Sequence, residues 1–156
     1  MRLTLITALI TLVVDQLTKL LVVHGLNLRA RGEIDVFPPY LNFRMAWNEG
    51  INFGLLSRQD DLMKWILVAI ALAISAAVLW WVHRERPRTA GMIAAGLLVG
   101  GAIGNVIDRL VYGAVADFLN MSCCGIENPY AFNVADIAIF LGAAALVLIP
   151  ADKKAG

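Results

Sequence analysis

Four long runs of hydrophobic residues, separated by more polar segments, dominate the pattern of this chain. The runs cover residues 3–23, 62–82, 90–110 and 131–151, and each holds few ionisable side chains. An α-helix of about 20 residues crosses the ~30 Å hydrocarbon core of a bilayer. The pattern therefore predicts an all-α integral membrane protein with four transmembrane helices.

The composition favours a membrane protein over a soluble one. Hydrophobic residues make up 60% of the 156 residues and charged residues 16%, whereas soluble domains contain about 45–50% apolar and about 25% charged residues. Too little polar chain is left to cover a soluble core. The net charge of +1 gives no strong field that would attract nucleic acid. We expect one membrane-embedded domain, residues 1–156.

The distribution of basic residues predicts the orientation of the spans. The segment between the third and fourth spans, residues 111–130, contains no Lys or Arg. Because Lys and Arg collect in cytoplasmic loops, we expect both termini in the cytoplasm and the 24–61 segment outside it. The basic residues that support this orientation are Arg2, Arg84, Arg86, Arg88, Lys153 and Lys154.

The outer segment, residues 24–61, is long enough to have structure of its own. Apolar and polar residues alternate from Leu41 to Asn48, which predicts a β-strand. Pro38 and Pro39 mark a turn before that strand. We expect a short helix to follow around residues 53–57.

The polar residues of three spans are expected at one depth. At about 1.5 Å per residue, Asp15 lies roughly 18 Å and Lys19 roughly 24 Å along the first span, in the outer half. Ionisable residues inside a membrane are costly and usually functional. The outer end of the third span adds Asn105, Asp108 and Arg109, and the start of the fourth adds Asn133 and Asp136.

The sequence alone leaves two alternatives for the pair Asp15 and Lys19, and two for Asp108 and Arg109. Asp15 and Lys19 are four residues apart, so they form either a structural ion pair or a substrate contact. Asp108 and Arg109 end a helix and either reach toward the interface or belong to a polar network. Because Asn105 and Arg109 share a helical face, we favour the network, as support for a site.

Three glycines, Gly96, Gly100 and Gly104, follow one line of the third span. Small residues at this spacing allow another helix to approach closely. The glycines therefore predict a packing face that brings the polar groups of two helices together. Ser75, the lone hydroxyl of the second span, is interpreted as a packing residue.

Asp117 and Asp136 have no Lys or Arg three or four residues away. Two carboxylates close together do not both ionise readily, so such a pair holds one proton between them. The ionised carboxylate can then activate water while its protonated partner donates to a peptide carbonyl. The pair suggests an aspartic protease, and a proton or ion relay is the alternative.

Other hydrolytic and metal chemistries lack their residues. The chain contains neither an H-E-x-x-H nor a G-x-S-x-G motif. Cys123 and Cys124 are adjacent and are expected to be a loop feature, either free or joined as a vicinal disulfide. With His24 and His83 as the two histidines, we expect no metal and no cofactor.

Five short motifs, in order along the chain, resemble those of lipoprotein signal peptidase, also called signal peptidase II. The family patterns are D-x-x-x-K, N-x-G-x-x-F-G, G-G-x-x-G-N-x-x-D-R, V-x-D-F and F-N-x-A-D. In this chain they fall at residues 14–19, 48–54, 100–109, 115–118 and 132–136. The resemblance extends from Val14 to the end of the fourth span.

The resemblance implies an aspartic endopeptidase of the cytoplasmic (inner) membrane that needs no cofactor. Because four helices can enclose one pair of aspartates, we expect a monomer. Its substrate would be a diacylglyceryl-modified prolipoprotein, cut just before the lipidated cysteine. Asp117 and Asp136 match the two catalytic aspartates, and the outer segment matches a small β-cradle with a short interfacial helix. The matched residues that support the pair or contact substrate are Asp15, Lys19, Asn48, Gly50, Asn105, Asp108, Arg109 and Asn133.

One segment departs from the family pattern. Residues 120–127, which include both cysteines, match no motif and put the geometry of the outer loop in doubt.

A proton- or ion-coupled transporter should carry ionisable groups through both leaflets, but the inner halves of the spans are apolar. A non-enzymatic assembly factor would tolerate Asp117→Asn, since asparagine still forms hydrogen bonds between helices.

Overall fold

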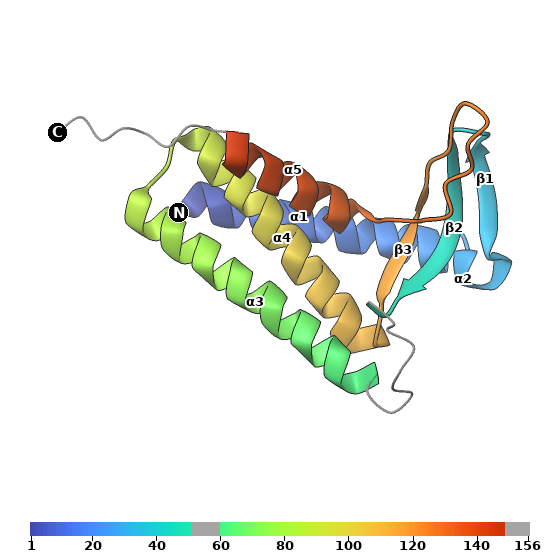
Figure 1. Ribbon diagram of the computed structural model, residues 1–156, viewed down its shortest axis with the longest axis horizontal. Helices are drawn as coiled ribbons and strands as arrows, with labels where there is room; N and C mark the ends of the chain where they lie inside the picture. Colours follow the sequence, from blue (N-terminus) through green and yellow to red (C-terminus); the bar gives the residue numbers. More distant parts are fainter. Residues whose placement is uncertain (51–59, 149–156) are drawn as a thin grey trace.

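The computed structural model describes residues 1–50 and 60–148, and it places a helical bundle beside a small sheet (Figure 1). The N-terminus and the connection between α3 and α4 lie at the end of the bundle away from the sheet. The helices are α1 (Arg2–Lys19), α2 (Leu28–Arg31), α3 (Asp60–Glu85), α4 (Thr89–Tyr112) and α5 (Val134–Leu148), and α1 continues into a π-helical segment, Leu20–Gly25.

Among the described residues, three helices are long and apolar enough to cross a membrane: Arg2–Gly25, Leu62–Glu85 and Thr89–Tyr112. They confirm the long helices predicted for the first three spans. The start of the fourth predicted span, residues 131–151, needs a correction, because α5 begins at Val134, whereas the end of that span lies outside the described residues. Phe132 pairs with the end of β3 instead, which keeps the chain extended just before the helix.

The sheet has three antiparallel strands in the order β1-β2-β3. They are β1 (Glu33–Phe37), β2 (Leu41–Asn48) and β3 (Val115–Asn120). The predicted strand from Leu41 to Asn48 and the turn at Pro38 and Pro39 are confirmed. The third strand was not predicted, since it comes from the segment after α4. The helix expected around residues 53–57 lies outside the described residues.

Close packing of α4 follows from its glycines. A Cβ on Gly96 would lie 2.7 Å from the Thr4 carbonyl oxygen, and one on Gly100 would lie 2.5 Å from that of Ala8. The predicted packing face is therefore confirmed, and α1 is the helix that occupies it. On another side of α4, a Cβ on Gly101 would lie 2.5 Å from the Ala135 carbonyl oxygen of α5. These glycines hold α1 and α5 close against α4.

Apolar side chains divide into a small core and a broad outer surface. The core beneath the sheet contains Val23, Leu28 and Phe118, with Phe43 of β2 against the ring of Phe118. Many large apolar side chains on the outside of the bundle are exposed, as expected for helices that face lipid. Ser75 is buried and donates to the carbonyl of Ala71 in its own helix, which agrees with a packing role.

Candidate active site

The polar residues predicted to share a depth are joined by hydrogen bonds between α1, α4 and α5, the helices that run toward the sheet in Figure 1. All ten residues predicted for the site belong to one connected network of hydrogen bonds and ion pairs. Six of the ten are buried in a largely apolar protein: Asp15, Lys19, Asn105, Asp108, Asp117 and Asn133.

Lys19 lies at the centre of the first group. Its Nζ donates to Oδ2 of Asp15 at 2.8 Å and forms an ion pair with Oδ2 of Asp108 at 2.7 Å. A longer bond of 3.4 Å reaches Oδ1 of Asn105. The predicted Asp15–Lys19 pair is confirmed. Asp108 is fully buried against Lys19, so the alternative in which it reaches toward the interface is wrong.

Gln16 joins the same two aspartates. Its Nε2 donates to Oδ1 of Asp108 at 3.0 Å and to Oδ2 of Asp15 at 3.1 Å. The sequence predictions gave this residue no role, because it occupies an unspecified position of the first motif. A signal was present, since an amide side chain beside an aspartate is unusual in an otherwise apolar helix.

Asp15 and Asp108 also bind backbone groups of other elements. Oδ1 of Asp15 accepts from the N–H of Ala135 at 2.9 Å, in the first turn of α5. Oδ2 of Asp108 accepts from the N–H of Ala116 at 3.1 Å, in β3. Ala135 and Ala116 directly precede Asp136 and Asp117. Each buried aspartate of the helices therefore holds the backbone next to one aspartate of the predicted pair.

Asp117 is held by amide groups. It lies on β3 opposite Ala46 of β2 and is almost fully buried. Its Oδ1 accepts from Nδ2 of Asn133 at 2.6 Å, and its Oδ2 accepts from Nδ2 of Asn48 at 3.1 Å. Burial, with the negative charge of Asp136, raises the pKa of Asp117 to about 6. This carboxyl group can therefore hold a proton near neutral pH.

Asp136 occupies the first turn of α5, as predicted. The N–H of Asp136 donates to Oδ1 of Asn133 at 2.9 Å, and the N–H of Asn133 donates to Oδ2 of Asp136 at 3.3 Å. This reciprocal arrangement is a capping box with aspartate in the usual place of glutamate. Oδ1 of Asp136 accepts from Nδ2 of Asn105 at 2.9 Å. Asn133 thus contacts both aspartates of the pair.

Gly50 and Arg109 lie at the edge of the network. Gly50 has a φ of +105°, and its N–H donates to Oδ1 of Asn48 at 3.1 Å, which orients the Asn48 amide toward Asp117. Nη1 of Arg109 donates to the Asn105 carbonyl at 3.3 Å, while its buried Nε finds no acceptor among the described residues. The rest of the second motif, residues 51–54, lies outside the described part.

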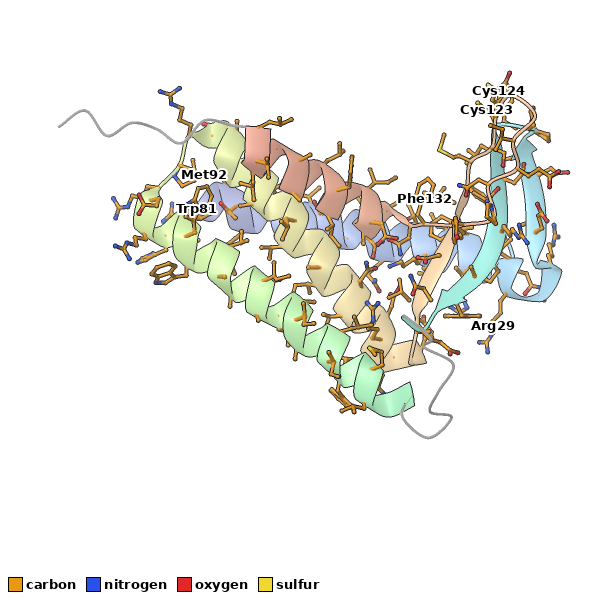
Figure 2. All side chains as sticks on the ribbon, in the orientation of Figure 1. Arg29, Trp81, Met92, Cys123, Cys124 and Phe132 are labelled. Carbon is orange, nitrogen blue, oxygen red and sulfur yellow. The ribbon has the colours of Figure 1, made fainter. Side chains whose placement is uncertain are left out.

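Cys123 and Cys124 are exposed and free, so the disulfide alternative is wrong for this structure. Figure 2 shows them at the tip of the loop that follows β3, away from Phe132, which lies just before α5. Asn120 closes the base of this loop by donating to the carbonyls of Asn128 and Tyr130. Within residues 1–50 and 60–148, no three His, Cys, Asp or Glu side chains are grouped to hold a metal ion.

Known proteins match this chain along most of its length. A sequence profile of signal peptidase (SPase) II matches residues 7–150. The chain belongs to the signal peptidase II family. It is 41% identical over 149 residues to a lipoprotein signal peptidase of Rhodopseudomonas palustris, a match that covers 94% of this chain and 90% of the relative. A lipoprotein signal peptidase of Methylobacterium is 40% identical over 144 residues, covering 92% and 86%.

The fold has a solved counterpart as well. A bacterial membrane enzyme determined by the in meso method at 1.9 Å superposes with a TM-score of 0.78 at 26% identity, covering 92% of this chain and 89% of the other. Signal peptidase II is an aspartic peptidase, so this chain is an enzyme of that class and a multi-pass membrane protein. The transporter alternative finds no support in these relatives.

Proposed function

We propose that this protein is an intramembrane aspartic endopeptidase that removes the signal peptide from diacylglyceryl-modified prolipoproteins, with cleavage just before the lipidated cysteine. Membership of the signal peptidase II family and its lipoprotein signal peptidase relatives support the activity. The observation that carries the proposal is structural. Asp117 and Asp136, on different elements, are joined through Asn133.

In the proposed mechanism, Asp117 and Asp136 share one proton. The ionised carboxylate takes a proton from water, and the hydroxide attacks the carbonyl carbon of the scissile peptide bond. The protonated carboxyl donates its proton to the carbonyl oxygen, which gives a neutral tetrahedral intermediate. As the C–N bond breaks, the carboxyl proton passes to the leaving nitrogen and a hydroxyl group of the intermediate gives its proton to the other carboxylate, so the pair again holds one proton.

The remaining site residues have supporting roles in this proposal. Asn48, Asn105 and Asn133 donate to the two carboxylates and fix their orientation. Gly50 orients Asn48 through its backbone N–H. Asp15, Lys19 and Asp108 form a buried support, and Arg109 binds the Asn105 carbonyl at the edge of the network.

We further propose four membrane spans with both termini in the cytoplasm, so that the site lies toward the extracytoplasmic face of the inner membrane. The fourth span is α5, an apolar helix whose Phe140 and Val147 are 71% and 84% exposed. Acyl chains anchored in the bilayer fix the depth of a lipidated cysteine. The polar network lies at the sheet end of the helices, where such a cysteine would present its peptide bond. One chain supplies the whole pair, which is consistent with a monomer.

The activity is tested with purified protein in lipid vesicles and two forms of one prolipoprotein, with and without the diacylglyceryl group. We expect cleavage of the modified form alone, with a product whose first residue is the lipidated cysteine by mass spectrometry. The matched control is Asp35→Asn, which alters an exposed carboxyl on β1 and should cleave as the wild type does. Equal cleavage of both forms, or a cut elsewhere, would contradict the proposed specificity.

The orientation has a separate test that uses the chain's own cysteines. Cys123 and Cys124 are exposed in the loop after β3 and are the two cysteines of the sequence. A membrane-impermeant maleimide should label them in intact spheroplasts, and Cys123→Ser/Cys124→Ser should abolish the label. Labelling that requires disruption of the membrane would place this loop, and the site with it, on the cytoplasmic side.

A further inference from the structure

Gln16 lies between the two buried aspartates that hold the predicted catalytic pair. Its Nε2 is 3.0 Å from Oδ1 of Asp108 and 3.1 Å from Oδ2 of Asp15, with a longer contact of 3.4 Å to the Gly104 carbonyl. A carboxamide has two N–H donors. The single amide group of Gln16 can therefore donate to both carboxylates at once.

Donors around the two aspartates are limited. Lys19 supplies one ammonium for both carboxylates, at 2.8 and 2.7 Å, and both carboxylates are fully buried. A buried carboxylate that lacks donors is costly. Gln16 supplies the further donors, and because it contacts both aspartates at once it fixes the distance between them.

Asp108 and Asp15 each bind a backbone N–H next to one member of the predicted pair. The distance that Gln16 fixes between them therefore also affects the spacing of that pair. Asp108 holds the N–H of Ala116 at 3.1 Å, one residue before Asp117. Asp15 holds the N–H of Ala135 at 2.9 Å, one residue before Asp136. A continuous path therefore runs from β3, through Asp108, the Gln16 amide and Asp15, to the first turn of α5.

We infer that Gln16 is a positioning residue of the peptidase, which sets the spacing of Asp117 and Asp136 through Asp108 and Asp15. This inference rests on the proposed function. Gln16 reaches neither carboxylate of the pair directly, so it acts on the geometry of the pair and not on substrate binding. Its removal should lower kcat and leave KM nearly unchanged.

The test compares Gln16→Met and Gln16→Glu with the wild type, by cleavage of the diacylglyceryl-modified prolipoprotein and by thermal melting. Methionine keeps the length without donors, and glutamate keeps the shape while adding a third carboxylate. Because small displacements in an active site have large kinetic effects, we expect Gln16→Met to lose kcat on the order of 10- to 100-fold, with KM within about twofold. Gln16→Glu should lose more.

Thr18→Val is the matched control, since Thr18 lies two residues further along α1 and its hydroxyl donates to the Asp15 carbonyl of its own helix. It should keep the kcat of the wild type. Wild-type kcat in either folded Gln16 variant, or a raised KM with unchanged kcat, would overturn the inference while the proposed function stands. If one variant fails to melt cooperatively, the other decides the question. If the wild type itself does not cleave the substrate, the proposed function fails, and the inference fails with it.

Discussion

Two pairs of aspartates lie at the sheet end of the helices, and they differ in their partners. Asp15 and Asp108 share the ammonium of Lys19. Asp117 and Asp136 share Asn133, which donates to one carboxylate and caps the helix that carries the other. None of the ion pairs found within the described ranges includes Asp117 or Asp136. One pair is bound by a cation, and the other is bound by amides.

This difference shows how one residue type serves two purposes in one small protein. A carboxylate bonded to a cation is a fixed acceptor, so Asp15 and Asp108 can hold backbone groups of α5 and β3 in place. Carboxylates bonded to neutral amides keep the freedom to exchange a proton. The cation-bound pair gives the site its geometry, and the amide-bound pair is left available for chemistry.

The largest expected loss of stability comes from removing the ammonium group of Lys19, which Asp15 and Asp108 share. In Lys19→Met two buried carboxylates lose their charged partner, which should lower the free energy of unfolding by about 3–5 kcal/mol. Chemical denaturation in detergent measures the loss. Arg84→Met is the control, because Arg84 and Glu85 form an ion pair of 3.6 Å with side chains 65% and 38% exposed. That pair should contribute less than about 1 kcal/mol, and equal losses would contradict the comparison.

The next largest expected change in stability comes from the proton affinity of Asp117, a member of the amide-bound pair. The pKa of Asp117 is raised from its ordinary 3.8 to about 6 by burial and by the charge of Asp136. Between those values the folded protein binds more protons than the unfolded one, so stability falls as pH rises from about 4 to about 6. Relative to Asp117→Asn, the wild type should lose at most about 3 kcal/mol over that interval.

Melting curves of the wild type and of Asp117→Asn at several pH values between 4 and 7 measure this difference. The gap between the two curves should change with pH across the interval and become constant above it. If the two proteins respond to pH in parallel, Asp117 has the same proton affinity in the folded and unfolded states. Its carboxyl would then be no different from an exposed one.

A substitution at Gly104 should have a smaller effect on Asp15 and Asp108, the pair that Lys19 binds. A Cβ on Gly104 would lie 2.6 Å from Oδ2 of Asp15, which accepts from Lys19, while Oδ1 of the same carboxylate accepts from the N–H of Ala135. Gly104→Ala should therefore cost about 1–3 kcal/mol through overpacking and should lower the rate of cleavage. Gly25→Ala is the matched control, because its new Cβ would meet its nearest neighbour, the Leu20 carbonyl oxygen, at 3.8 Å. Equal thermal stability of the two variants would argue against a fixed Asp15.

The smallest change in stability separates two roles of Asn133. Serine keeps an oxygen that can cap α5, but it has no amide for Asp117. Asn133→Ser should therefore destabilise the protein less than removal of the cap would, while the rate of cleavage falls markedly. Asn133→Ala removes both contacts and should melt lower than the serine variant. Wild-type cleavage by Asn133→Ser would show that the bond to Asp117 is dispensable.

Features that depend on local sequence were predicted well. The long helices, the strand from Leu41 to Asn48 and the Asp15–Lys19 pair follow from periodicity and from four-residue spacing. The glycine line of α4 correctly predicted a close helical neighbour, although the sequence did not identify α1 as that neighbour. These properties depend on residues within one or two turns of each other.

Features that depend on contacts between distant segments were not predicted. The pairing of β3 with β2 joins Asn48 to Asp117, which are 69 positions apart. The start of α5 at Val134 depends on the pairing of Phe132 with Leu119. The role of Gln16 depends on the approach of α4 to α1, so it was visible only once the helices were assembled. Most site residues were identified from the positions of polar groups along the chain, whereas Asn48 and Gly50 were identified through a family motif, and the bonds among all of them required the fold.

The most direct test of the central claim is the cleavage rate of Asp117→Asn and of Asp136→Asn, each purified in lipid and each with its melting temperature measured. Diacylglyceryl-modified prolipoprotein is the substrate, and Asp35→Asn is the control. If the amide-bound pair performs the chemistry, each variant should fold and lose cleavage by on the order of 10³-fold or more, while the control keeps the wild-type rate. Substantial cleavage by either folded variant would contradict the account and make that aspartate structural.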